Sequence, residues 1–350
     1  MKPLKVGFIG AGANTRNTHL PQLKKIEGVV LSEVANRTVE SSLAVARDFN
    51  IDRTRDHWRE VATSPSVDAV VIGTWPNLHC EATCLALEHG KHVLTEARLA
   101  RNAEEARQML MVSRRYPGLI TQVVPSPFTL HADATVKSIL ENGQLGRLNH
   151  FFFEFSSPPS TPQGAPLHWR RNRELSGLNT MVLGIAYESL LRWLGPADWV
   201  SASGAVLNNR ALDPHTRQEV PVDIPDFLTV RLQMKNGVAG TFVLTETGNT
   251  GRPSRFCLQG EKGLLEIPFK VDGELQLGRS GAAGVTWAPC PIDDSLRGRW
   301  RVEEEFVGAI RRENPIEYTT FETGVEYMVF TEAVHRSFKM DGIPVSLADI

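Results

Sequence analysis

Residues 4–15, LKVGFIGAGANT, decide the fold class of this 350-residue chain. The apolar run from Leu4 to Ile9 has the length of a buried strand, and Gly10-Ala-Gly12 follows it directly. Glycines in such a turn let backbone amides approach a pyrophosphate, and they aim the next helix N-terminus at it. Thr15 stands where a third glycine or an alanine is usual, so the turn alone also fits other α/β proteins. Its place after the first strand favours a dinucleotide site.

Strands and helices alternate from this turn to Val124. We expect further strands at residues 29–35, 67–73, 92–94 and 119–124, and helices at 39–49, 79–89 and 103–114. Strands alternating with helices of this length form β-α-β units with a parallel sheet and right-handed crossovers. The sequence therefore predicts a Rossmann domain over residues 1–124, with a doubly wound parallel sheet.

The pattern changes at Pro125. After a helix that ends near Gly143, we expect strands at residues 149–156, 199–206, 227–234, 238–246, 255–259, 264–267 and 274–277. We expect helices at 180–194, 301–312 and 323–339, with Tyr187 in the core and Glu188 at the surface or in a subunit contact. This order favours a largely antiparallel sheet. The sequence predicts a second α/β domain over residues 125–350.

Composition sets the broad class of the protein. The formal net charge is −2, with 41% hydrophobic and 22% charged residues, so nothing favours nucleic acid or an anionic membrane as a partner. No apolar run reaches the roughly 18 residues that a membrane-spanning helix needs. Four cysteines without C-x-x-C spacing indicate free thiols in a reducing compartment, and no metal site is expected. We expect a cytoplasmic protein.

Candidate cofactor contacts lie at three strand ends. In the first turn they are Gly10, Gly12, Ala13 and Asn14. The second strand ends at Asn36-Arg37-Thr38, where an acidic residue would accept the ribose 2′-hydroxyl of NAD. Arg37 suits a 2′-phosphate instead, so NADP is preferred over NAD, unless Arg37 is simply solvated. After the strand at 67–73, Thr74 and Asn77 offer hydrogen bonds, Trp75 offers a ring to pack on the cofactor, and His79 either joins them or begins the next helix.

Longer stretches resemble one protein family. The runs GAGANTRNTHLPQL, VDAVVIGTWPNLH, GKHVLTEARLARNAEEA, ENGQLG, HWRRNRELSG, LGIAYESLLRWLG, QGEKGLLE and EAVHRSFKMDGIPVSL are similar to the Gfo/Idh/MocA (glucose-fructose oxidoreductase-like) dehydrogenases. The resemblance covers essentially the whole chain. It implies a Rossmann domain, an α/β domain with an open antiparallel sheet, and NAD(P) chemistry on sugars, polyols or related hydroxy compounds. It also implies homodimers or homotetramers formed through that sheet, and a cofactor contact at Glu96.

The chain departs from the family at three polar positions. The family usually has Glu-Lys-Pro where this chain has Glu96-Ala97-Arg98, and Asp and His where it has Val182 and Ala186. Val182 and Ala186 stand four residues apart, so on a helix both would point the same way and present an apolar face. Moving the hydroxyl proton typically contributes about 10²–10⁴-fold to such a reaction, so other groups must act or the reaction differs.

Three residues are candidates to replace the polar groups that the family usually has in the active site. His168 is the general acid or base by type, unless it is an idle loop histidine. Asn179 either shares the face of Val182 or caps the helix. Arg98 could bind a substrate carboxylate or phosphate in a bidentate manner, or it could lie at the surface.

The sequence thus predicts an NAD(P)-dependent oxidoreductase with non-standard catalytic residues, acting on a sugar-like compound. Two alternatives stay open. In the first, a tightly bound cofactor serves elimination, epimerisation or glycoside cleavage. In the second, the chain is a noncatalytic dinucleotide-binding partner protein.

Overall fold

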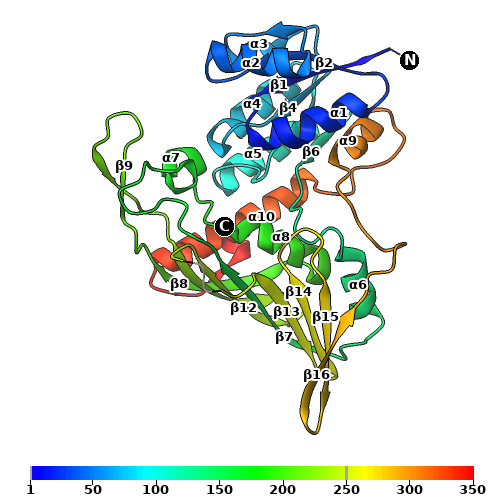
Figure 1. The fold of residues 1–350 in the computed structure, drawn as a ribbon, viewed down its shortest axis with the longest axis vertical. Coiled ribbons are helices and arrows are strands. Elements are labelled where there is room, and N and C mark those ends of the chain that lie inside the picture. Colours follow the sequence, from blue (N-terminus) through cyan, green and yellow to red (C-terminus); the bar gives the residue numbers. More distant parts are fainter. Residues whose placement is uncertain (1, 249–250) are drawn as a thin grey trace. The chain divides into compact units, whose positions relative to one another are not determined.

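The chain divides into two compact units in a computed structural model that describes residues 2–248 and 251–350 (Figure 1). The first unit runs to Pro125 and also contains Arg301–Met328; the second comprises Ser126–Trp300 and Val329–Ile350. The sequence predicted one uninterrupted second domain from residue 125 to 350. Residues 301–328 return to the first unit instead, because side chains such as Glu305 and Tyr327 bond to it: Gln122 Nε2 donates to Glu305 Oε1 (3.2 Å), and Leu99 N donates to the Tyr327 hydroxyl (2.6 Å).

The first unit is built on a parallel sheet. Its strands are β1 (Leu4–Ile9), β2 (Val29–Ala35), β3 (Arg53–Thr54), β4 (Ala69–Ile72), β5 (His92–Thr95) and β6 (Thr121–Val123). Its helices are α1 (Leu20–Lys25), α2 (Val39–Phe49), α3 (Trp58–Thr63), α4 (Pro76–Glu88), α5 (Ala103–Arg115), α9 (Val302–Ile310) and the start of α10 (Phe321–Lys339). The strand order is β3-β2-β1-β4-β5-β6, with every pair parallel, so the order reverses between β1 and β4. The predicted Rossmann-like sheet is confirmed, and ligands of such sheets bind at that reversal.

The second unit is built on a larger sheet. Its strands are β7 (Leu148–Ser156), β8 (Ala197–Ala205), β11 (Phe227–Met234), β12 (Ala239–Thr245), β13 (Arg255–Gly260), β14 (Gly263–Pro268), β15 (Leu275–Gly281), β16 (Gly284–Cys290) and β17 (Val345–Ser346). Its helices are α6 (Asp133–Glu141), α7 (Arg173–Ser176), α8 (Leu183–Leu194) and the rest of α10; β9 (Arg210–Leu212) and β10 (Glu219–Pro221) form a separate hairpin. The nine strands follow the order β16-β15-β14-β13-β7-β12-β11-β8-β17, antiparallel except for β7 with β12. The predicted mostly antiparallel sheet is confirmed.

Period-two alternation along β7 separates a buried face of this sheet from an exposed one. Phe151 and Phe153 are buried, and the ring of Phe153 lies 4.4 Å from that of Phe256, whereas Phe152 between them is 48% exposed. Tyr187 of α8 stacks on Phe330 of α10 at 3.8 Å between ring centroids, as its predicted core position requires.

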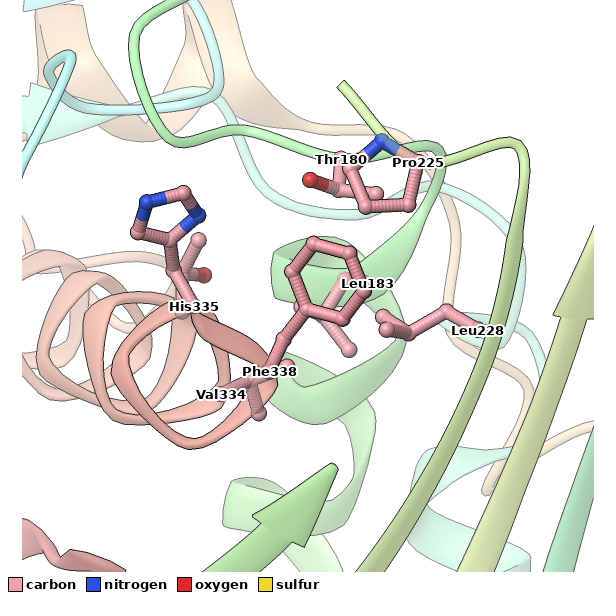
Figure 2. Close-up of a pocket in the computed structure, with 8 residues that line it drawn as sticks. Thr180, Leu183, Pro225, Leu228, Val334, His335 and Phe338 are labelled. Atoms are coloured by element: carbon pink, nitrogen blue, oxygen red, sulfur yellow. The ribbon is translucent and has the colours of Figure 1, made fainter. Parts of the chain in front are cut away.

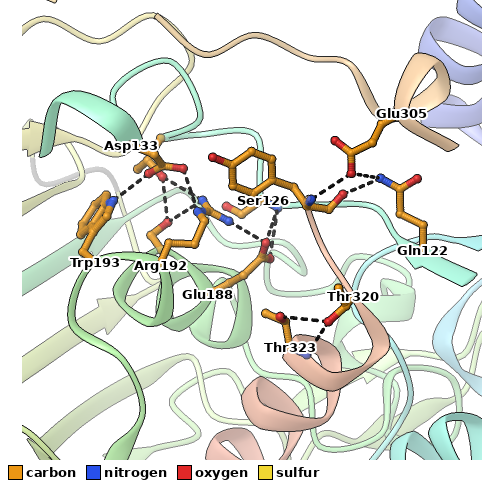
Figure 3. Close-up of polar contacts among 12 residues, drawn as sticks. Gln122, Ser126, Asp133, Glu188, Arg192, Trp193, Glu305, Thr320 and Thr323 are labelled. Atoms are coloured by element: carbon orange, nitrogen blue, oxygen red, sulfur yellow. Dashed lines mark hydrogen bonds and ion pairs between the residues drawn. The ribbon is translucent and has the colours of Figure 1, made fainter. Parts of the chain in front are cut away.

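The prediction for Glu188 is wrong, because its side chain is fully buried in the network of Figure 3. Arg192 bridges two carboxylates: its Nη1 lies 2.7 Å from Glu188 Oε1, and its Nε lies 2.7 Å from Asp133 Oδ2. The backbone N–H of Ser126 donates to Glu188, and Trp193 Nε1 donates to Asp133 Oδ1 at 2.8 Å. A buried charge persists when it is paired in this way, and periodicity alone does not reveal the partner.

Candidate functional site

The glycine turn after β1 has one crowded glycine and one open glycine. Gly10 has a φ of +77°, and a Cβ there would stand 2.5 Å from Thr74 Cγ2, so only glycine fits where this turn meets the segment after β4. Gly12 is exposed, and a Cβ there would meet nothing closer than the Gly73 carbonyl oxygen at 3.4 Å. Ala13 and Asn14 beside it are exposed too. The turn therefore leaves room for a phosphate group above Gly12, which fits the predicted cofactor.

The end of β2 is bonded to this turn. Asn36 Oδ1 accepts from Ala11 N at 2.6 Å, and Asn36 Nδ2 donates to Ser41 Oγ at 2.8 Å. Thr38 caps α2, since its hydroxyl oxygen accepts from Ser41 N. Arg37 is exposed, and its guanidinium carbon lies 5.4 Å from the centre of the Trp75 ring. Asn36 and Thr38 thus shape the loop, while Arg37 and Trp75 form a cation–π pair beside it.

The segment after β4 leads into α4, which begins at Pro76. The Thr74 hydroxyl donates to the Trp75 carbonyl at 3.2 Å, and Asn77 is exposed in the first turn of the helix. His79 lies inside α4 with no exposed surface: its Nδ1 is 3.0 Å from the Arg98 carbonyl oxygen and its Nε2 is 3.1 Å from that of Thr74. Burial lowers the pKa of His79. Its side chain therefore holds the segments after β4 and β5 in place and presents nothing to a ligand.

The polar cluster after β5 contains two residues that the sequence analysis missed. Glu96 Oε1 accepts from Asn14 Nδ2 at 2.6 Å and lies 3.1 Å from His19 Nε2. The other ring nitrogen, His19 Nδ1, lies 2.5 Å from Glu303 Oε1 of α9. Burial alone would lower the pKa of His19, but hydrogen bonds to Glu303 and Glu96 and their charges raise it to about 9.

Helix geometry explains why His19 was missed. Residues Thr15–His19 form a π-helix, in which residues five apart share a face, so Asn14 and His19 both reach Glu96. The usual α-helical spacing of three or four residues does not pair these positions. The sequence signal that could have indicated His19 is its position a few residues after the glycine turn, within the run GAGANTRNTHLPQL that resembles the family.

The three candidate catalytic residues have different environments. His168 is half-buried and begins a short 3₁₀ helix, where its Nδ1 accepts from Arg170 N at 3.4 Å. Burial and the neighbouring Arg170 charge lower the pKa of His168. Arg98 is only 5% exposed, so the surface alternative for it is wrong.

Asn179 lies outside helix α8, which begins at Leu183. Both sequence-based alternatives for Asn179 are therefore wrong: it neither shares a helical face with Val182 nor caps the helix. Its Nδ2 donates to the Ser176 carbonyl at 2.7 Å, because the preceding segment closes a turn there before the helix starts. Ala186, at the position where the family usually has histidine, is fully buried.

A small pocket lies wholly within the second unit (Figure 2). It is lined mainly by apolar side chains of α8, β11 and α10, with His335 at its side. Burial, then the charges of Arg173 and Lys339, lower the pKa of His335 to about 4, so the ring is neutral at pH 7. None of the predicted site residues lines this pocket.

Residues 2–248 and 251–350 contain no group of three His, Cys, Asp or Glu side chains arranged to hold a metal ion. None of the helices described there is long and apolar enough to cross a membrane. All four cysteines are free thiols, and Cys80 and Cys84 are buried on α4.

Two family models match this chain. Residues 4–122 match the model described as an oxidoreductase family with an NAD-binding Rossmann fold, and residues 134–266 match the GFO/IDH/MocA C-terminal domain. Together they account for more than half of the chain.

Curated relatives and solved structures point the same way. Levoglucosan dehydrogenase of Pseudarthrobacter phenanthrenivorans is 25% identical over 70% of this chain and 66% of that protein. The mouse trans-1,2-dihydrobenzene-1,2-diol dehydrogenase is 28% identical over 75% of this chain and 74% of that protein. A structure of levoglucosan dehydrogenase in complex with NADH and L-sorbose covers 98% of both chains with a TM-score of 0.85 at 21% identity, which establishes a shared fold.

Proposed function

Since the chain belongs to the Gfo/Idh/MocA oxidoreductase family, we propose that it transfers a hydride between NAD(P) and a hydroxyl-bearing sugar, polyol or related compound. The observation that carries this proposal is the open position above Gly12. It lies after β1, where the strand order reverses, and neighbouring glycines are crowded by protein while Gly12 is not. The relatives named above supply the substrate class, because they act on levoglucosan and on a cyclic diol.

The cofactor would be held by residues of the first unit. The pyrophosphate would be surrounded by Gly10, Gly12, Ala13 and Asn14. The adenosine ribose would be contacted by Asn36, Arg37 and Thr38. The rest of the dinucleotide would be contacted by Thr74, Trp75, Asn77 and Glu96. The bound nicotinamide supplies the hydride acceptor or donor. His79 would act indirectly, by fixing Thr74 and the segment after β5.

We propose NADP as the preferred cofactor. The Glu33 carboxylate on β2 is buried and bonded by Arg55 (2.9 Å) and Ser64, so it is not a candidate to accept a ribose hydroxyl. Arg37 is exposed at the end of the same strand and can approach a 2′-phosphate. NAD is the alternative, since the levoglucosan dehydrogenase structure contains NADH.

Proton transfer needs a group that the usual family positions no longer provide, because Ala97, Val182 and Ala186 have no titratable atoms. We assign it to His168, whose lowered pKa keeps the ring neutral at pH 7 and able to accept a hydroxyl proton as the hydride departs. Arg98 would bind an anionic group of the substrate or orient the hydroxyl, and Asn179 could hold a water that passes the proton on.

The test is steady-state turnover with a panel of sugars and polyols. His168→Ala should lower kcat by about 10²-fold or more while dinucleotide Kd stays unchanged. His215→Ala, at an exposed loop histidine of the same unit, is the matched control and should leave both unchanged. Full turnover by His168→Ala would refute the assignment of the proton-transfer group.

A noncatalytic role is the second candidate, because three usual proton-transfer positions are apolar together. It would be favoured if the wild-type protein bound dinucleotide but turned over no member of the panel. Cofactor that stays bound through purification would instead favour its use in elimination, epimerisation or glycoside cleavage.

We also propose that the protein is a cytoplasmic homodimer or homotetramer formed through the nine-stranded sheet. Phe152 is exposed on the face of this sheet where such a contact would form, while its neighbours Phe151 and Phe153 are buried in the core. Light scattering of the purified protein measures the mass, and a monomer at micromolar concentration would contradict the proposal.

A further inference from the structure

The His19 ring joins three separate segments of the first unit. It belongs to the π-helix after the glycine turn, and its two nitrogens face Glu96, which follows β5, and Glu303 of α9. The ring has no exposed surface, and the Glu303 side chain is 2% exposed. Water therefore does not screen these contacts, and each ring nitrogen depends on the carboxylate that it faces.

The geometry fixes the charge of the ring. Both nitrogens lie within 3.1 Å of a carboxylate oxygen, and an ionised carboxylate only accepts hydrogen bonds. A neutral imidazole has one N–H, so it would place a lone pair against one of the two carboxylates. The Asn14 Nδ2 donor also lies 3.3 Å from His19 Nε2, but its shorter contact, at 2.6 Å, is with Glu96 Oε1. The arrangement is satisfied when both nitrogens carry hydrogen, which makes His19 a cation between two anions.

Glu96 is the member of this cluster nearest to the candidate site. Its side chain is 16% exposed, and the exposed Asn14 of the glycine turn donates to the same oxygen that faces His19. In the sheet, β5 lies on the far side of β4 and β1 from β2. Glu96 is therefore at the opposite end of the site from Asn36 and Arg37, where the adenosine ribose is expected.

We propose that His19 is a positioning residue for the nicotinamide half of the dinucleotide. As a buried cation clamped by Glu303, it holds the Glu96 carboxylate against Asn14 and so fixes the end of the glycine turn that this half must contact. The inference rests on the proposed dinucleotide binding and adds a residue with no direct contact to the ligand. It gives the buried Glu303 of α9 an indirect role in a cofactor site that the first strands form.

The experiment compares ligands that differ by the nicotinamide half. Affinities for NADH, NADPH and AMP, which lacks the pyrophosphate link and the nicotinamide half, are measured by calorimetry at fixed salt for wild type, His19→Gln and His89→Gln. His89 is an exposed histidine of the same unit and is the matched control. We expect His19→Gln to weaken binding of the complete dinucleotide about tenfold, the size of one lost charge-assisted hydrogen bond, and to leave AMP binding unchanged.

A second measurement needs no ligand. In the wild type, nitrogen NMR of the labelled imidazoles should show His19 protonated at both nitrogens at pH 7.5 and titrating near pH 9. Glu303→Gln should move that titration to lower pH and weaken dinucleotide binding in the same way as His19→Gln. This variant keeps the inference testable if His19→Gln does not fold.

Three outcomes are distinguishable. If the wild type binds no dinucleotide, the proposed function fails and the inference with it. If it binds normally but both variants bind as tightly, the clamp does not position the site. If binding of AMP and of the dinucleotide is weakened equally, or His19 titrates near pH 6.5, the ring has a merely structural role and the inference is overturned.

Discussion

At the scale of single residues, Gly10 and Gly12 of the same turn meet different physical requirements. Gly10 is required by the fold, because its positive φ and the nearby Thr74 side chain exclude a Cβ. Gly12 is not required by any neighbour in the described structure, so a side chain there would obstruct a ligand above the turn and not the fold. The difference allows binding to be tested without disturbing the fold.

Gly12→Val should abolish most dinucleotide binding. The new side chain fits the protein but would occupy the space above the turn, so Kd should rise more than about tenfold while the melting temperature changes little. Gly118→Val is the control, because a Cβ at this exposed glycine also meets no neighbour. Equal Kd values for Gly12→Val and wild type in calorimetry would mean that the cofactor binds elsewhere.

Arg37→Ala tests the choice between the two dinucleotides. Loss of one charge-assisted contact to a 2′-phosphate should weaken NADP binding about tenfold and change NAD binding little. Arg47→Ala, at an exposed arginine of α2, controls for the general loss of positive charge. The NADP preference is wrong if NAD binds more tightly at the same salt concentration and Arg37→Ala leaves that ratio unchanged.

At the scale of helices and strands, hydrophobic periodicity was a good guide wherever an element buries one regular face. The limits of β1, β2, α2 and β11 were predicted to the residue. The short hairpin β9–β10 was missed, because three-residue strands such as Arg210–Leu212 have no period to detect. The predictions for Asn179 and Glu188 are wrong for tertiary reasons. The position of Asn179 depends on where α8 starts, and the burial of Glu188 depends on its ion pair with Arg192.

The polar network on α8 predicts a large stability effect. Arg192→Met removes the cation between Glu188 and Asp133, which are fully buried or nearly so, and leaves two buried charges uncompensated. The free energy of unfolding should fall by about 3–5 kcal/mol. The control Arg210→Met breaks a pair that is 68% and 62% exposed, for which a loss of at most about 1 kcal/mol is expected. Urea unfolding measures both, and similar losses in the two variants would contradict this account.

At the scale of the whole molecule, the His19 cluster makes stability depend on pH. The pKa of His19 is raised from 6.5 to about 9 in the folded state. The stabilisation that its protonated ring contributes is therefore complete below pH 6.5 and is lost as pH rises through 9. The groups that face it are Glu96, Glu303 and the neutral Asn14. The wild-type protein should therefore lose more unfolding free energy between pH 6.5 and 9.5 than His19→Gln does. Equal losses in the two proteins would show that His19 is not protonated in the folded chain.

The return of Arg301–Met328 to the first unit has a consequence for biosynthesis. The ribosome synthesises the chain from its N-terminus, and in many multidomain proteins the N-terminal domain folds before the rest of the chain emerges. Here Glu303, Glu305 and Tyr327, which bond to His19, Gln122 and Leu99, are synthesised about two hundred residues after the last strand of the parallel sheet. The nascent sheet must wait, without these partners, while Ser126–Trp300 of the second unit is translated. Because contacts between residues far apart in the sequence slow folding, the first unit should complete its fold later than its size alone suggests.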